Sequence, residues 1–149
     1  MKMLWRFIFA VPMLVFAAAP TALLAAETPS SQDVSHATRA VELTFLKSLP
    51  GERDNLRQFI EKNWFAMDAI AQKQGLMAAY TVLDSGSDEG MWNILVAVTY
   101  HTPQGYEGIL DAFERIRSAH KTMLIDGKSI KDLGRIVDSK KLQERVPSA

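Results

Sequence analysis

The residue with the clearest chemical interest is Asn63, a polar amide inside an apolar pattern. It lies at helical spacing between Phe59, Ile60, Met67 and Ile70. A buried amide without partners costs about 1 to 3 kcal/mol, so Asn63 either bonds to a nearby backbone group or faces a ligand between a helix and a sheet. Buried polar groups are usually satisfied inside the protein, which favours the first alternative.

Three aromatic residues are further candidates for ligand contacts. Trp64 follows Asn63, and its indole suits a pocket as well as it suits a core. Tyr80 and Trp92 lie in β-rich runs, where aromatic residues are favoured for packing alone. We include all three as candidates, with core packing as the alternative for each.

Two histidines complete the candidate set. His101 ends an apolar β-rich run, and His120 ends the apolar stripe of a later helical segment, so both are expected at the edges of a cavity. No short histidine pair and no convergent carboxylate is recognisable, so we predict no metal site. We also expect no cofactor, with single axial haem ligation by either histidine as the alternative.

Composition excludes several classes of function. The chain has 149 residues and no cysteine, which excludes disulfides, thiol nucleophiles and thiolate metal sites. Its 17 basic and 17 acidic residues are interleaved, and no concentrated basic face is present to track nucleic acid. The sequence Ser85-Gly86-Ser87 lacks the context of a nucleophile elbow. No catalytic motif therefore identifies an activity.

The N-terminal segment has the layout of a secretory signal. Lys2 and Arg6 precede an uncharged apolar run from Phe7 to Ala26. We predict a signal peptide over residues 1–26, cleaved after Ala26, with an uncleaved anchor as the alternative. Residues 27–39 are polar and are expected to be a flexible mature N-terminus. The protein is thus expected to be exported, to the periplasm or the extracellular space, without a stable membrane anchor.

The elements that must position the candidates alternate between strand and helix. A strand is predicted over Ala40–Ser48, stopped by Pro50-Gly51. A helix from about Glu52 to Lys73 follows, closed by Gly75. Its apolar face holds Leu56, Phe59, Ile60, Trp64, Met67, Ile70 and Ala71.

The second half is expected to repeat this alternation. Leu76–Asp84 and Met91–His101 form a hairpin, and the second run is apolar enough for a strand covered on both faces. A helix follows, with a stripe running from Tyr106 to His120. One helical turn near Lys131–Leu133 leads to a last strand from Arg135 to Leu142.

This order predicts one α+β domain over residues 40–146, of the ferredoxin-like βαββαβ type. With its Leu49-Pro50-Gly51 break, Asn63-Trp64 in the helix, and the closing Asp126-Gly127-Lys128 and Leu133–Val137 segments, the domain resembles the dimeric α+β barrel superfamily. That superfamily includes the antibiotic-biosynthesis monooxygenase-like, NIPSNAP-like and stress-responsive barrel domains. The resemblance implies a homodimer in which two sheets face each other.

Three hypotheses for function follow. The first is an exported binding or accessory module whose cavity holds a small apolar or aromatic molecule. The second is a cofactor-independent monooxygenase-like enzyme acting on a small aromatic substrate, as the resemblance implies. In the superfamily's haem-degrading members an Asn, Trp and His set acts, but here Trp92 and His101 lie on one strand. The third is a purely structural, dimer-forming envelope protein.

Overall fold

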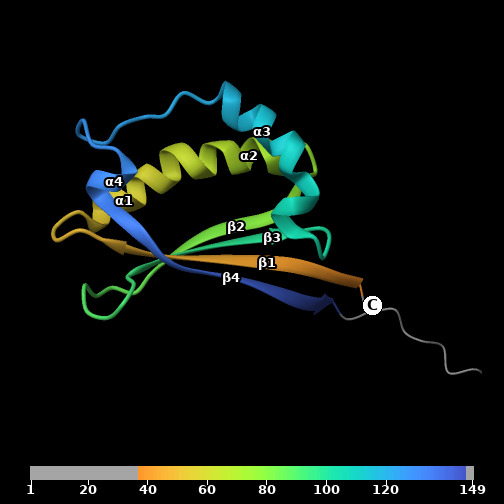
Figure 1. The fold of residues 1–149 in the computed structure, drawn as a ribbon, viewed down its shortest axis with the longest axis horizontal. Helices are drawn as coiled ribbons and strands as arrows, with labels where there is room; N and C mark the ends of the chain where they lie inside the picture. Colours follow the sequence, from red (N-terminus) through yellow and green to blue (C-terminus); the bar gives the residue numbers. More distant parts are fainter. Residues whose placement is uncertain (1–36, 147–149) are drawn as a thin grey trace, which may run out of the picture. The chain divides into compact units, whose positions relative to one another are not determined.

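Residues 37–146 are described by a computed structural model, in which helices cover one face of a sheet (Figure 1). The sheet has four strands, antiparallel throughout, in the order β2-β3-β1-β4. The α+β class expected from the sequence is confirmed. The expected signal peptide, residues 1–26, and most of the expected flexible segment, residues 27–39, lie outside the described residues.

The central strand β1 (Ala37–Ser48) pairs with β3 (Ile94–Tyr100) on one side and with β4 (Gly134–Val146) on the other. Successive side chains alternate between the two faces. Leu46 is therefore fully buried beneath the helices, whereas Phe45 lies on the outer face. β1 begins before its predicted start at Ala40, because its first residues pair with the end of a β4 that is longer than predicted.

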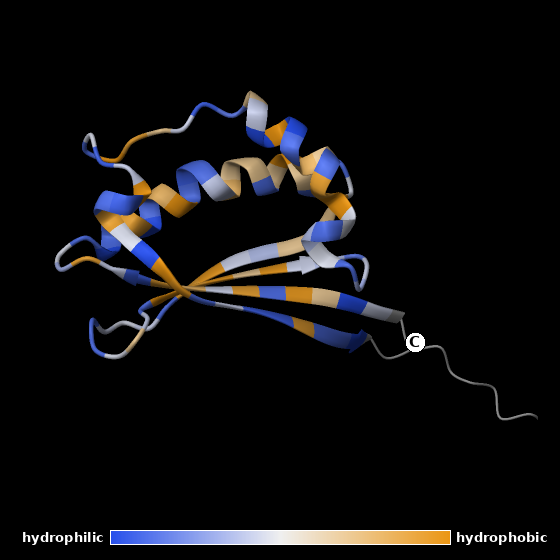
Figure 2. Ribbon diagram, viewed as in Figure 1, coloured by the Kyte–Doolittle hydropathy of each residue, from blue (hydrophilic) through white to orange (hydrophobic). Residues whose placement is uncertain are grey.

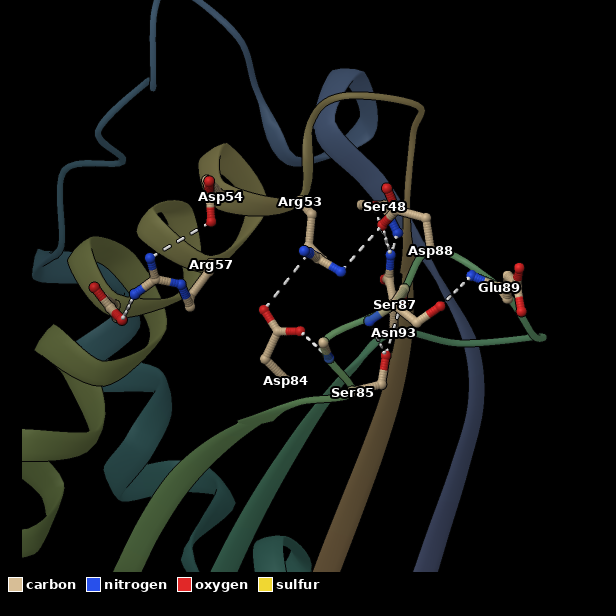
Figure 3. A network of polar contacts seen from close by, with 12 residues as sticks. Ser48, Arg53, Asp54, Arg57, Asp84, Ser85, Ser87, Asp88, Glu89 and Asn93 are labelled. Atoms are coloured by element: carbon tan, nitrogen blue, oxygen red, sulfur yellow. Dashed lines mark hydrogen bonds and ion pairs between the residues drawn. The ribbon is translucent and has the colours of Figure 1, made fainter.

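β2 (Met77–Asp84) and β3 form a hairpin whose loop is held by a polar network (Figure 3). The buried Asn93 side chain donates to Ser48 Oγ (2.8 Å) and Asp88 Oδ1 (3.0 Å), and its Oδ1 accepts from the Ser48 N–H (3.0 Å). Arg53 adds ion pairs to Asp84 (3.7 Å) and Asp88 (3.5 Å). β3 starts at Ile94, three residues later than the predicted Met91, and the Asn93 backbone bonds to Leu46 and Ser85 just before it.

The first long helix runs without a break from Arg53 to Lys73 but contains one π-helical turn. It consists of α1 (Arg53–Phe59), the π turn η1 (Ile60–Trp64) and α2 (Phe65–Lys73). The Phe65 N–H donates to the Ile60 carbonyl, five residues earlier. Such a turn holds one extra residue, which rotates the residues after it by about 100° relative to an unbroken α-helix.

That rotation changes which side chains of α2 are buried. Ile70 is 44% exposed, so its predicted position on the apolar face is wrong. Asp68 is buried on that face of the helix instead of Ile70. The physical reason is that the period of 3.6 residues per turn is not kept through residues 60–64, where the helix is a π-helix.

The second helical segment consists of η2 (Gly105–Ile109), a 3₁₀ turn, and α3 (Leu110–Ala119). Gly105 has φ +66°, and a Cβ there would collide with the Glu42 carboxylate, so glycine is required where η2 crosses β1. The predicted stripe extends one residue too far, because α3 ends before His120, which is extended. The short helix α4 (Ile130–Leu133) then leads into β4.

The core lies between the helices and the sheet, and along β1 hydrophobic and hydrophilic residues alternate, as expected for a strand with one face on a core (Figure 2). One buried cluster is built around Leu46, Leu56 and Phe59. The second includes Met77 and Phe113 near the other end of the sheet. Val98 of β3 packs against both clusters.

Candidate functional site

A cavity of about 640 Å³ lies between the helices and the sheet, beside the second core cluster. β3 contributes Val96, Val98 and Tyr100 to its lining, and α3 contributes Phe113. Most of the lining is apolar or aromatic, with a few polar groups. Both the volume and this mixture are typical of sites for small molecules, which occupy about 300 to 1,000 Å³.

The π turn brings a carboxyl group into this cavity. In an unbroken α-helix Asp68 would lie beside the apolar stripe instead of within it. Trp64, the last residue of η1, lines the cavity, and the extra residue in η1 turns α2 so that Met67 and Asp68 line it as well. π turns of this kind are frequent at functional sites.

Asp68 is the most unusual group in the lining. It is 6% exposed, and among residues 37–146 no hydrogen bond or ion pair engages its carboxyl group. Burial raises the pKa of Asp68 from 3.8 to about 7, because apolar surroundings disfavour the ionised form. Near neutral pH the group can therefore either donate or accept a proton.

Tyr100 faces the same cavity from the sheet. It is 4% exposed, and its hydroxyl donates to Glu42 Oε2 at 3.4 Å. Burial, followed by the negative charges of Glu42 and Asp68, raises the pKa of Tyr100 well above its usual range. Tyr100 thus stays a neutral hydrogen-bonding group at all ordinary pH values.

Tyr106 and Arg117 line the cavity from η2 and α3. The Tyr106 N–H donates to Glu42 Oε1 (3.1 Å), and its hydroxyl donates to Glu114 Oε1 (3.1 Å). Burial and the Glu114 carboxylate raise the pKa of Tyr106. The Arg117 guanidinium binds both oxygens of Glu114, at 2.6 Å and 3.1 Å, so its charge is already paired.

This arrangement can do two things chemically. It can enclose a small, largely apolar molecule and bind one polar group of it through Asp68. It can also move a proton, because a carboxyl group with a pKa near neutrality works as a general acid or base. Which of the two applies depends on what the cavity holds.

Asn63 is bonded within the protein. Its Nδ2 donates to the carbonyls of Phe59 and Met123, both at 3.0 Å, and its Oδ1 accepts from the Met123 N–H at 2.7 Å. His120 Nε2 lies 3.1 Å from the same oxygen. The amide ties the π turn to the segment after α3, and Asn63 is not among the residues that line the cavity.

The other predicted candidates are spread over the domain. Trp64 lines the cavity, whereas Tyr80 packs against Phe65, with ring centroids 4.8 Å apart. Trp92 makes an edge contact with Phe45, at 5.3 Å, on the outer side of the sheet. His101 is exposed in the turn after β3. Asn63 and His120 meet each other, and of the six candidates Trp64 alone joins the cavity.

The sequence pattern does not predict that Asp68, Tyr100, Tyr106 and Arg117 share one site. The missing information is the position of the π turn, since a helical projection that includes it would bring Asp68 onto the apolar face. No sequence signal locates that turn here. The feature that comes nearest to such a signal is Asn63, which lies in the π turn and whose amide donates to the carbonyl of Phe59, just before the turn.

Within residues 37–146, no group of three or more His, Cys, Asp or Glu side chains is arranged to hold a metal ion. In the same range no helix has the length and apolar character needed to span a membrane. Comparison of the chain with family models, curated proteins and solved structures finds no match.

Proposed function

We propose that this protein binds a small, predominantly apolar or aromatic molecule in the cavity between its helices and its sheet. Asp68 is the polar anchor of that site. The observation that carries the proposal is a buried carboxyl group that lines an apolar cavity and has no protein partner among the described residues. A buried carboxyl group that has no partner within the protein, and whose pKa burial raises, is typical of functional sites.

The proposed architecture is the ferredoxin-like one of the dimeric α+β barrels. The sheet order β2-β3-β1-β4, with helical segments between β1 and β2 and between β3 and β4, supports it. A homodimer is part of the proposal. It is supported by the apolar outer sheet face, defined here by cross-strand neighbours that point away from the helices: Val41, Leu43, Phe45, Leu83, Leu95, Ala97 and Leu142.

Export is the proposed localisation, to the periplasm or the extracellular space. It rests on the basic start and apolar run of residues 1–26. The mass of the mature protein from the exported fraction tests it. A chain that starts at Glu27 is expected, and a chain that retains residues 1–26 would contradict cleavage.

The second candidate function is a cofactor-independent monooxygenase-like enzyme. The observation that favours it is the buried Asp68 carboxyl group, which lines the same cavity as the Tyr100 hydroxyl and whose pKa burial raises to about 7. A carboxyl group of this kind can take a proton from a weakly acidic aromatic substrate and so activate it. Binding precedes catalysis in this scheme, so the cavity is the site under either hypothesis.

Binding is tested by NMR titration of the isotope-labelled protein with neutral aromatic probes: toluene, phenol and indole. We expect saturable shifts of the amides of cavity-lining residues. Val98→Phe fills the cavity and should abolish these shifts, whereas the control Ala97→Val alters the neighbouring position on the outer face and should preserve them. Absence of shifts, or shifts confined to the outer sheet face, would overturn the proposal.

A further inference from the structure

We infer that the cavity selects a ligand with a cationic nitrogen, a small aromatic or alkyl ammonium compound, which the Asp68 carboxylate and the surrounding aromatic side chains bind together. This inference rests on the proposed binding function and names the chemical class of its ligand.

The charges around the cavity favour a cation. Asp68 lines it directly, and Glu42 bonds to the Tyr100 hydroxyl and to the Tyr106 N–H. Arg117 is the one basic residue in the lining, and its charge is taken up by Glu114. The site therefore has an unpaired acidic group and no unpaired basic group in its lining, which is unfavourable for a carboxylate or phosphate ligand.

The aromatic residues of the lining add to this preference. Trp64, Tyr100, Tyr106 and Phe113 come from four different elements and surround one cavity. The last two are in edge contact, with centroids 5.5 Å apart. Aromatic rings attract ammonium groups, and aromatic cages with a carboxylate are a recurrent means of binding alkylated amines.

The competing class is a neutral ligand whose carbonyl or ether oxygen accepts a hydrogen bond from protonated Asp68. The two classes differ in the sign of their pH dependence. An ammonium group needs the carboxylate, so it binds more tightly as the pH rises through the pKa of Asp68, about 7. A neutral acceptor needs the protonated acid and binds more tightly at lower pH. The other titratable or charged groups in the lining are Tyr100, Tyr106 and Arg117, with Glu42 and Glu114 bonded to them, and burial and carboxylate charges keep both tyrosines neutral between pH 6 and 8.

The test is a calorimetric or NMR titration with benzylamine and with benzyl alcohol, which have similar shapes and differ in charge. Wild type should bind benzylamine at least tenfold more tightly than benzyl alcohol at pH 8, and the benzylamine affinity should fall about tenfold at pH 6. Asp68→Asn should abolish both differences, so that the variant binds the two probes with similar affinity at pH 6 and at pH 8. The control Asp111→Asn alters an exposed carboxyl group on α3 and should change neither.

The outcomes separate the inference from the function on which it rests. Equal or tighter binding of benzyl alcohol, strengthening toward pH 6, would overturn the ammonium class and leave the binding site in place. Failure of both probes to bind would overturn the proposed function as well. A benzylamine affinity that survives Asp68→Asn would remove Asp68 from recognition, and thermal melting of that variant checks that it is folded.

Discussion

At the scale of single residues, the buried carboxyl group of Asp68 serves the proposed binding function but lowers the stability of the ligand-free protein when it is ionised. Its burial without a partner raises the pKa, which means that the folded state holds the carboxyl proton more tightly than the unfolded chain does. The folded protein is therefore more stable when Asp68 is protonated than when it is ionised. A ligand that supplies a partner for the carboxylate would remove this penalty, because binding to the native state alone stabilises it.

Asp68→Asn should make stability less dependent on pH. In wild type, the contribution of Asp68 is fully present below about pH 4 and is lost as the pH rises to about 7, since the pKa rises from 3.8 to about 7 on folding. The free energy of unfolding of the variant, relative to wild type, should therefore increase by a few kcal/mol, about 1.4 per pH unit, between pH 4 and pH 7. Urea unfolding at pH 4, 6 and 8 measures it. The exposed-site control Asp54→Asn should show no such trend, and a difference that is constant with pH would contradict the assignment.

Asn63 acts as a structural bridge. Asn63→Leu should lower the free energy of unfolding by about 2 to 3 kcal/mol, because the variant leaves the Phe59 carbonyl and both backbone groups of Met123 without the side-chain partners they now have. Chemical denaturation measures this loss. The exposed neighbour Lys62→Leu serves as control and should change stability by less than about 0.5 kcal/mol. A stable Asn63→Leu protein that no longer binds aromatic probes would point to a ligand role instead.

At the scale of elements, the loop between β2 and β3 is fixed to β1 by a buried amide. Asn93→Ala removes the acceptor for the Ser48 N–H and the donor to Ser48 Oγ and Asp88. We expect a loss of about 2 to 4 kcal/mol in stability and faster hydrogen exchange at the Ser48 amide. Hydrogen exchange measured by NMR gives the loss of stability from the slowest-exchanging core amides and the local effect from the Ser48 amide. Ser87→Ala, in the exposed part of the same loop, should leave the Ser48 amide protected, and equal exchange in both variants would refute the role of Asn93.

The π turn η1 is the element that makes the site. It leaves the N-terminal part of the helix packed as the apolar pattern predicts, with Leu56, Phe59 and Ile60 buried. Beyond the turn, the extra residue moves Asp68 into the cavity and Ile70 out of the core. One residue inserted into one turn thus exchanges a hydrophobic side chain for a carboxyl group at the buried face.

At the scale of the whole molecule, the helices cover one face of the sheet and leave the outer sheet face open (Figure 1). Leu83 and Leu142 on that face are 52% and 49% exposed. Exposed apolar residues grouped on one face are typical of interfaces, and on this face they surround Lys140, the cross-strand neighbour of Leu43. Packing against a second copy would give β3 the cover on both faces that its nearly continuous apolar sequence indicates.

Leu43→Lys should convert the proposed dimer into a monomer. The substitution puts a second lysine beside Lys140, the cross-strand neighbour of Leu43 on the outer sheet face, so a second copy would have to bury two adjacent like charges. Native mass spectrometry and sedimentation measure the change, and wild type should have twice the mass of the chain. The control Ile70→Lys alters an exposed apolar residue on α2 and should stay dimeric. A wild-type monomer would remove the dimer from the proposal.

The sequence by itself determined the α+β class, the order of the elements and most of their bounds. Composition and turn residues act locally: Pro50-Gly51 stops β1, Gly75 follows α2, and the nearly continuous run of apolar, mostly β-forming residues over 94–100 indicates a strand. It also identified Asn63 as a buried amide that needs partners, and the structure supplies them from residues distant in the chain.

Only the tertiary structure decided which residues share the cavity. Asp68, Tyr100, Tyr106 and Arg117 belong to four elements, and their meeting depends on how α2 and α3 lie over the sheet. The rotation of α2 depends on the one extra residue in the π turn η1, and no rule of helix propensity or residue spacing predicts where that turn occurs. The physical reason is that local patterns fix what each element is, whereas a site is fixed by the relative rotation of elements, which only packing determines.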